Sequence, residues 1–343
     1  MKSISSICAC FLALSCVAQI PPGYYDSAQG LNGQPLRSAL HNIIDNHDAQ
    51  SYGSLWIFFQ QTDNKGGNTV WDIYSDVPGG APAYSYQFGS DQCGSYGAEG
   101  DCFNREHTFP QSWYGSGNPM KSDLFHVYPS DGFVNGARSN DPYGEVDGAF
   151  FVSTNGSLSG PNTFPGYIGN VFEPIDEYKG DLARNYFYMM TRYMDISGGW
   201  GSPMLSNGDL IQWAVNLLVT WHQNDPVSTK ELDRNNAVYG VQDNRNPFID
   251  HPEWVEDIWI NTTAIGEQIQ TLQARVFYSN GQVHIGSEQG LHFMLLSANG
   301  QELLQREISG KAIIDVDLPS GLYIVVLSRA GQFYAQKVMV DGS

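Results

Sequence analysis

The strongest candidate for chemistry is an acid and an imidazole that stand side by side, Glu106 and His107. They lie in the segment CFNREHTFPQSW (102–113), which is too polar for a buried strand. A carboxylate can bind a hard cation, and a neutral imidazole can accept a proton from water. Because Glu-His dipeptides are common by chance, the pair alone predicts little.

A second segment, KSDLFHVYPSDGFVNGARSNDPYG (121–144), crowds polar side chains around short apolar anchors. Its Asn135 offers an amide oxygen and its Arg138 a guanidinium that suits a phosphate. Oxygen ligands such as Glu106 and Asn135 favour Mg²⁺, with Mn²⁺ or Ca²⁺ as alternatives, over Zn²⁺, which prefers His and Cys.

A third segment, WHQNDPVSTKELDRNNAVYGVQDNRNPFIDHPEWVEDIW (221–259), combines polar turns with aromatic anchors. Three of its residues are interpreted as turn formers and caps rather than ligands: Asp225, Asn246 and Asp250. Three histidines of the chain are interpreted as supports of the fold: His126, His222 and His251. No two of them have the close H-x-x-x-H spacing of a zinc hydrolase.

These segments resemble the endonuclease I family of exported bacterial nucleases. The resemblance rests on three ordered blocks, NREHTFPQSW (104–113), SDLFHVYPSDGFVNGARSN (122–140) and DPVSTKELDRNNAVYGVQDNRNPFIDHPEW (225–254), and covers about residues 36–260. It implies an α+β fold in which a ββα-metal (His-Me) finger packs among several helices. A small all-β sandwich is expected to follow.

By the same resemblance, Glu106 and Asn135 are the metal ligands and His107 is the general base for water. The implied activity is hydrolysis of DNA, with RNA as an alternative, and with little sequence specificity. A neutral His107 needs an oxygen, from a backbone carbonyl or a side chain, to orient its other ring nitrogen. Neighbouring residues of a regular strand point to opposite faces, so we also expect a local twist or bulge.

The chain is shorter between Trp113 and Ser122 than some members of the family, which carry there an Arg that steadies the product phosphate. We assign this role to Arg138, with Lys121 as an alternative. Arg105 is a weaker candidate, because its side chain should diverge from that of Glu106. An ordinary ion pair remains the alternative role for each of the three.

The composition raises an objection to a nuclease. The 343 residues include 17 Lys plus Arg against 36 Asp plus Glu, a formal net charge of -19. Net charge governs long-range attraction, but a local cleft or a bound cation can still hold phosphate. We therefore expect strong dependence on the divalent ion and loose binding of free duplex.

The first eighteen residues, MKSISSICACFLALSCVA, predict a signal peptide and export through the periplasm to the cell surface or medium. A lipid anchor on Cys16 is the alternative, although Ala13 stands where such signals usually have Leu. No later segment has the ~20 apolar residues of a membrane span. Cleavage would leave Cys93 and Cys102, which predict a disulfide in an exported protein.

Helices are predicted from apolar periodicity and caps at 36–47, 181–194, 209–221, 228–242 and 252–259. The run 54–60 fits a helix or a buried strand, and the run 69–74 resembles a strand. After residue 271 the pattern alternates with period two, and Asn299-Gly300 predicts a hairpin turn.

The predicted domains are the signal peptide (1–18), a catalytic domain (19–265) and a β-sandwich (272–343). The sandwich resembles the C-terminal sorting domain of type IX secretion, through HFMLLSANGQELLQ, DLPSGLYIVVLS and a final KVMV strand. This resemblance implies contact with a secretion machinery. A carbohydrate-binding or adhesive sandwich is the alternative.

The rival function is a surface adhesin or polysaccharide-binding protein, favoured by 19 Tyr, 8 Trp and the acidic composition. A structural Ca²⁺ site among the acidic residues is a third, weaker hypothesis. Glu106, His107 and Asn135 discriminate between them, because an adhesin has no use for this set. The expected partner is nucleic acid, and the chain is expected to be a monomer.

Overall fold

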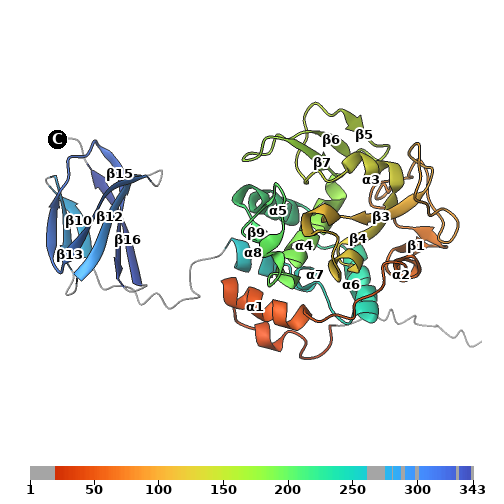
Figure 1. Cartoon of the computed structure of the whole chain (residues 1–343), viewed down its shortest axis with the longest axis horizontal. Coiled ribbons are helices and arrows are strands. Elements are labelled where there is room, and N and C mark those ends of the chain that lie inside the picture. Colours follow the sequence, from red (N-terminus) through yellow and green to blue (C-terminus); the bar gives the residue numbers. More distant parts are fainter. Residues whose placement is uncertain are drawn as a thin grey trace, which may run out of the picture. The chain divides into compact units, whose positions relative to one another are not determined.

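The computed structural model describes residues 20–260, 275–279, 281–286, 290–297, 301–329 and 332–340. The chain divides into two compact units, Met1–Thr262 and Thr263–Ser343. We call them the N-terminal unit and the C-terminal unit and describe each by itself (Figure 1). The predicted signal peptide and the predicted turn at Asn299-Gly300 lie outside the described residues.

Helix α4 (Asp176–Arg192) is the centre of the N-terminal unit. Every residue from Tyr178 to Arg192 is buried, so the helix packs on all sides. Its neighbours include α1 (Gly33–Ile44), α5 (Gln212–Asn224) and α7 (Pro247–Asp250). Its buried polar groups are paired, as where Arg184 Nη2 donates to Glu231 Oε2 at 2.8 Å.

The predicted helices correspond to α1, α4, α5, α6 (Thr229–Gln242) and α8 (Glu253–Trp259). Ser228 and Glu231 form a capping box at the start of α6. The ambiguous run is a helix, α2 (Leu55–Thr62). No helix among residues 20–260 is long and apolar enough to cross a membrane.

The predicted strand at 69–74 is much shorter than expected. Only Thr69–Val70 forms a strand, β2, which pairs with β1 (Asn64–Gly66). Beyond it, Asp72 Oδ1 accepts a hydrogen bond from the backbone N–H of Tyr74 at 2.8 Å. Such a side-chain bond to the backbone two residues ahead turns the chain and ends the strand.

Strands β3 (Phe103–His107) and β4 (Val127–Asp131) pair antiparallel, and β4 runs directly into α3 (Gly132–Arg138). The side chain of Asp131 caps α3 by accepting from Val134 N at 2.8 Å. This is the ββα arrangement that the resemblance implied, and Figure 1 shows its three elements together beside α4.

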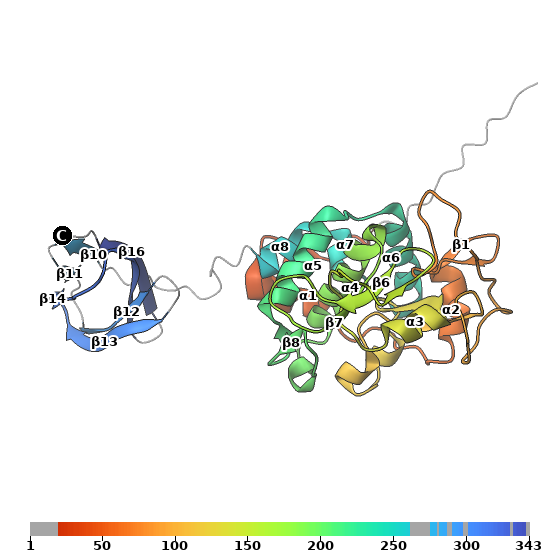
Figure 2. The same ribbon diagram turned by 90° about the horizontal axis from the view of Figure 1, so that it is seen from above.

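Two further small sheets complete the N-terminal unit. Strands β5 (Phe151–Val152), β6 (Leu158–Pro161) and β7 (Asn170–Glu173) form one of them, and it lies over α4 when the unit is viewed from above (Figure 2). The other is the short pair β8 (Leu205–Ser206) and β9 (Asp209–Leu210).

The C-terminal unit consists of two antiparallel sheets, of order β10-β11-β14 and β13-β12-β15-β16. Alternate residues of each central strand are buried, for example Val283 and Ile285 in one sheet and Val325 and Leu327 in the other. These side chains share one core, so the predicted all-β sandwich is confirmed. Its strands are β10 (Arg275–Ser279), β11 (Gln282–Gly286), β12 (Gly290–Ser297), β13 (Glu302–Ser309), β14 (Ala312–Asp315), β15 (Gly321–Arg329) and β16 (Gln332–Val340).

Candidate active site

The junction between β4 and α3 is fixed by the buried carboxylate of Asp131. Its Oδ2 accepts from Tyr86 Oη at 2.5 Å and from Gly100 N at 2.9 Å, while its backbone N–H donates to Asp72 Oδ2 at 2.9 Å. Because both ends of the carboxylate and the backbone are bonded, the start of α3 has one defined position relative to β3.

Glu106 and Asn135 each keep one oxygen free of hydrogen bonds from the described residues. Glu106 is only 2% exposed, and its Oε1 accepts from Tyr74 Oη at 2.8 Å and from Arg138 Nη1. Asn135 Nδ2 donates to Asn104 Oδ1 at 2.7 Å, which holds the amide beside β3. The Glu106 Oε2 and Asn135 Oδ1 atoms are therefore left for another ligand.

This donor set fits a hard divalent cation. A carboxylate and an amide oxygen suit Mg²⁺, which usually takes one or two protein ligands and completes its shell with water and substrate phosphate. Among the described residues, no group of three or more His, Cys, Asp or Glu is arranged to hold a metal. The free oxygens of Glu106 and Asn135 are the best candidates for that ion in this part of the chain.

His107 is buried and oriented by the backbone. Its Nε2 lies 3.0 Å from the carbonyl oxygen of Lys121, so Nε2 carries the proton and Nδ1 is the basic nitrogen. Burial, followed by the nearby His126, lowers the pKa of His107 to about 3. The imidazole is thus neutral at neutral pH, and a backbone carbonyl orients it as predicted.

The pairing of β3 with β4 is regular at the site. The register runs without a shift from Phe103 opposite Asp131 to His107 opposite Val127. The local distortion that we expected is therefore not a bulge. His107 is instead the last residue of the strand.

Arg138 does not have the role that we assigned to it. The residue is 0% exposed, and its Nη1 binds Glu106 and also the carbonyl oxygen of His107 at 2.8 Å. Its Nη2 donates to the carbonyl oxygen of Thr108 at 2.7 Å. Because burial and these bonds hold the guanidinium inside the protein, it cannot reach a product phosphate. Arg138 positions Glu106 and the end of β3 instead.

The two other candidates for phosphate binding lie together against one aromatic ring. The Arg105 guanidinium lies 3.5 Å from the ring centroid of Tyr52, and Lys121 Nζ lies 4.8 Å from the same centroid. Arg105 Nη1 also donates to the carbonyl oxygen of Tyr52 at 2.6 Å. As predicted, Arg105 diverges from Glu106, whose carboxylate faces Tyr74 and Arg138.

The remaining histidines have bonds within the protein, as the sequence suggested. His126 is fully buried, and its Nε2 lies 2.6 Å from the carbonyl oxygen of Met120. His222 lies 3.1 Å from the carbonyl oxygen of Pro252, and His251 lies beside Glu253.

The residues interpreted as turn formers and caps also bind within the protein. Asn246 caps α7, Asp225 accepts from the backbone N–H of Gly180, and Asp250 pairs with Arg245.

A disulfide joins Cys93 to Cys102 in the loop before β3, with Cα atoms 5.7 Å apart. Tyr96 of this loop packs against α3, where a Cβ atom added to Gly132 would lie 2.5 Å from the Tyr96 ring. The two glycines of α3, Gly132 and Gly136, thus let the loop approach the helix that carries Asn135.

Two residues that hold the free oxygens in place, Asn104 and Tyr74, were not among those predicted from the sequence. Asn104 lies two residues before Glu106 on the same face of β3, so strand periodicity could have indicated it. Tyr74, which also bonds Tyr143 at 2.9 Å, follows an irregular loop, and no sequence pattern marks it.

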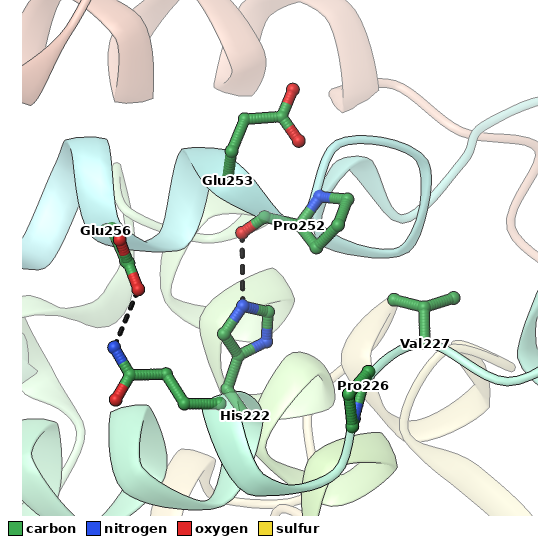
Figure 3. Close-up of a pocket in the computed structure, with 7 residues that line it drawn as sticks. His222, Pro226, Val227, Pro252, Glu253 and Glu256 are labelled. Atoms are coloured by element: carbon green, nitrogen blue, oxygen red, sulfur yellow. Dashed lines mark hydrogen bonds between the residues drawn. The ribbon is translucent and has the colours of Figure 1, made fainter.

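An open pocket lies elsewhere on the N-terminal unit, and neither Glu106, His107 nor Asn135 lines it (Figure 3). Figure 3 shows the His222 ring pointing to the carbonyl oxygen of Pro252. Gln223 Nε2 donates to Glu256 Oε1 at 2.6 Å. Because both nitrogens of His222 have partners, with Arg184 Nη1 3.2 Å from Nδ1, this histidine is not a free base.

Comparison with known proteins agrees with the geometry. A family model described as Endonuclease I matches residues 32–253. An extracellular ribonuclease of Bacillus amyloliquefaciens is 36% identical over 248 residues, 69% of this chain and 78% of that protein. An extracellular ribonuclease of Bacillus subtilis (strain 168) is 33% identical over the same shares. An Endonuclease-1 of Buchnera aphidicola subsp. Acyrthosiphon pisum (strain APS) is 27% identical over 130 residues, 38% of this chain and 45% of that protein.

Proposed function

Because this chain belongs to the endonuclease I family, we propose that it is a secreted, divalent-metal-dependent nuclease that hydrolyses phosphodiester bonds inside nucleic acid strands. One observation carries the proposal. The β3, β4 and α3 elements bring two unbonded ligand oxygens, on Glu106 and Asn135, to the strand that ends in a neutral, oriented imidazole, His107.

Glu106 Oε2 and Asn135 Oδ1 would hold the ion, with Mg²⁺ first and Mn²⁺ or Ca²⁺ as alternatives. When bound, the ion would neutralise phosphate charge and stabilise the leaving oxygen. Arg138 and Tyr74 hold the carboxylate of Glu106 through its other oxygen, so Oε2 keeps one direction. Asn104 does the same for the amide of Asn135.

His107 acts as the general base. Its Nδ1 removes a proton from a water molecule while the water oxygen attacks phosphorus, and the bond from phosphorus to the leaving oxygen breaks. The leaving oxygen then takes a proton from solvent. The carbonyl of Lys121 keeps the other proton on Nε2, which leaves Nδ1 as the acceptor throughout.

The substrate class is nucleic acid, and we propose that both RNA and DNA are cut. Two relatives that cover most of this chain are named extracellular ribonucleases, whereas those named Endonuclease-1 match a smaller part. A site that binds phosphate and metal without contacts to base edges has no basis for sequence specificity. The expected monomer needs no partner chain for this site.

We further propose that residues 1–18 direct export and that the C-terminal unit is a secretion sorting domain. The extracellular relatives support export. The all-β sandwich of the C-terminal unit is compatible with the type IX resemblance of its strands. The adhesin hypothesis has no comparable support in the N-terminal unit.

The test is cleavage of closed circular plasmid and of a single-stranded RNA by the purified chain from Gln19 onward, with Mg²⁺ or with EDTA. The His107→Ala variant should lose about a hundredfold to ten-thousandfold in rate, the usual range for a general base. His251→Ala is the matched control, because it removes a half-buried imidazole outside the site.

Cleavage that needs the metal and is lost in His107→Ala would support the whole proposal. If the native chain cleaves neither substrate with any divalent ion, the proposed function is wrong. Full activity of His107→Ala would keep the nuclease but assign the base to another residue.

A further inference from the structure

Most Lys and Arg side chains of residues 20–260 form an ion pair with Asp or Glu. Within residues 20–260, Arg105 and Lys121 are the only Lys or Arg side chains without an ion pair to Asp or Glu. The paired residues are Arg37, Lys65, Arg138, Lys179, Arg184, Arg192, Lys230, Arg234 and Arg245. Within this part of an acidic chain, two cations without acidic partners are an exception that needs an explanation.

These two cations lie on the same aromatic surface. Tyr52 contacts both of them, and the Arg105 guanidinium also lies 4.5 Å from the ring centroid of Trp56. Both cations are half-buried, so each has lost part of its water while still reaching solvent. A partly desolvated cation on an aromatic face gains strongly from a bound anion, because screening by water is reduced.

The pair also lies next to the proposed base. Arg105 is two residues before His107 on β3, so both side chains project from the same face of the strand. The carbonyl of Lys121 orients the imidazole, and the Tyr52 ring centroid lies 5.8 Å from that of His107. Besides burial, two positive charges without acidic partners therefore lie close enough to the imidazole of His107 to lower its pKa.

We propose that Arg105 and Lys121, held on the ring of Tyr52, form a binding site for a backbone phosphate adjacent to the scissile one. This inference rests on the proposed function and names the residues that hold the strand. Arg105 Nη1 is bonded to the carbonyl oxygen of Tyr52, which leaves Nε and Nη2 to donate to two phosphate oxygens. Lys121 adds a point charge. Arg138 cannot supply this charge, because its guanidinium is bonded inside the protein.

The first test is equilibrium binding of a fluorescein-labelled oligothymidylate of twelve nucleotides, in EDTA so that no hydrolysis occurs. Each phosphate contact to a single strand contributes about 0.7 to the slope of log K against log salt concentration. Lys121→Gln and Arg105→Gln should each lower that slope by about 0.7. Lys65→Gln, which removes a cation already paired with Asp76, should leave it unchanged.

The design separates binding from folding. Lys121→Gln keeps the backbone carbonyl that orients His107, and it removes a side chain with no hydrogen bond in the described structure, so its melting temperature should match the native value. This variant keeps the test valid even if Arg105→Gln unfolds. Slopes in Lys121→Gln equal to the native slope would overturn the inference, and so would absence of salt-dependent binding by the native chain.

A kinetic measurement distinguishes this inference from the proposed function. With Mg²⁺ and RNA, Lys121→Gln should raise KM several-fold and change kcat little, whereas a purely structural role would not move KM selectively. A native chain that binds with the expected salt slope but does not cleave would refute the proposed function and keep the phosphate site. If the native chain cleaves and Lys121→Gln has an unchanged KM, the proposed function is kept and the phosphate site is refuted.

Discussion

Charged side chains on the two sides of strand β3 differ in whether the protein supplies a partner of opposite charge. On one side, Glu106 is buried and its charge is balanced by Arg138 and a hydrogen bond from Tyr74. On the other side, Arg105 and Lys121 are half-buried and have no acidic partner, although the chain as a whole is strongly acidic. On the first side the buried charge is compensated within the protein, and on the second side positive charge is left for a ligand.

This difference explains how an acidic protein can act on an anionic substrate. The side with Glu106 must keep one carboxylate oxygen in a fixed direction, so the partners Tyr74 and Arg138 are buried. The substrate side must gain an anion and release it again, so its cations stay open to solvent. Local arrangement of a few charges matters more here than the net charge of the chain.

The largest loss in the free energy of unfolding is expected for Arg138→Met, and it tests whether the two sides of β3 differ in charge compensation. Removing Arg138 leaves the buried charge of Glu106 without compensation, which typically costs about 3 to 5 kcal/mol. Urea denaturation at pH 7 measures the loss. Arg105→Gln on the opposite side should cost about 1 to 3 kcal/mol, because it removes a hydrogen bond and cation–π contacts but leaves no buried charge without compensation.

The double variant Arg138→Met/Glu106→Gln should recover part of the stability lost in Arg138→Met, because it removes the unpaired charge. Equal losses for Arg138→Met and Arg105→Gln would mean that the two sides do not differ in charge compensation.

A smaller effect is expected for Tyr74→Phe, which deletes one donor to the Glu106 carboxylate. A hydrogen bond to a charged group contributes about 1.5 to 3 kcal/mol, and the same denaturation measurement would detect its loss. Tyr52→Phe is the matched variant on the other side of β3. Its hydroxyl has no hydrogen-bond partner in the described structure, so a change within about 0.5 kcal/mol is expected. A larger loss in Tyr52→Phe than in Tyr74→Phe would contradict the comparison.

A pH-dependent effect is expected for His126, whose ring centroid lies 5.6 Å from that of His107. Burial lowers the pKa of His126 below its usual 6.5, although Asp123 opposes the shift. The unfolded chain therefore takes up a proton below pH 6.5 that the native chain resists. This stability is fully present above pH 6.5 and is lost as the pH falls, by at most about 1.4 kcal/mol per pH unit for each such group.

His126→Gln keeps a donor for the carbonyl of Met120 but does not titrate. Its free energy of unfolding, measured relative to its own value at pH 8, should fall less steeply between pH 6.5 and 5 than that of the native chain. Parallel curves for the two proteins would show that His126 does not contribute to acid sensitivity.

Much of the fold follows from local patterns. The helices α1, α5, α6 and α8 were predictable because apolar periodicity and the capping box of Ser228 and Glu231 act within a few residues. The alternation of the C-terminal strands was equally clear. The strand at 69–74 was overestimated, because the side chain of Asp72 bonds the backbone and turns the chain after Val70.

The sequence by itself determined the family, through three ordered blocks, and with it the identity of Glu106, His107 and Asn135 as candidates. Only the tertiary structure decided which cations serve the protein and which are open to a substrate. In the sequence, Arg138 and Lys121 are both candidates for phosphate binding. In the structure, Arg138 is buried and bonded to Glu106, whereas Lys121 reaches solvent. The physical reason is that burial and charge pairing depend on contacts between segments far apart in the chain, such as Tyr52 with Arg105 and Tyr74 with Glu106.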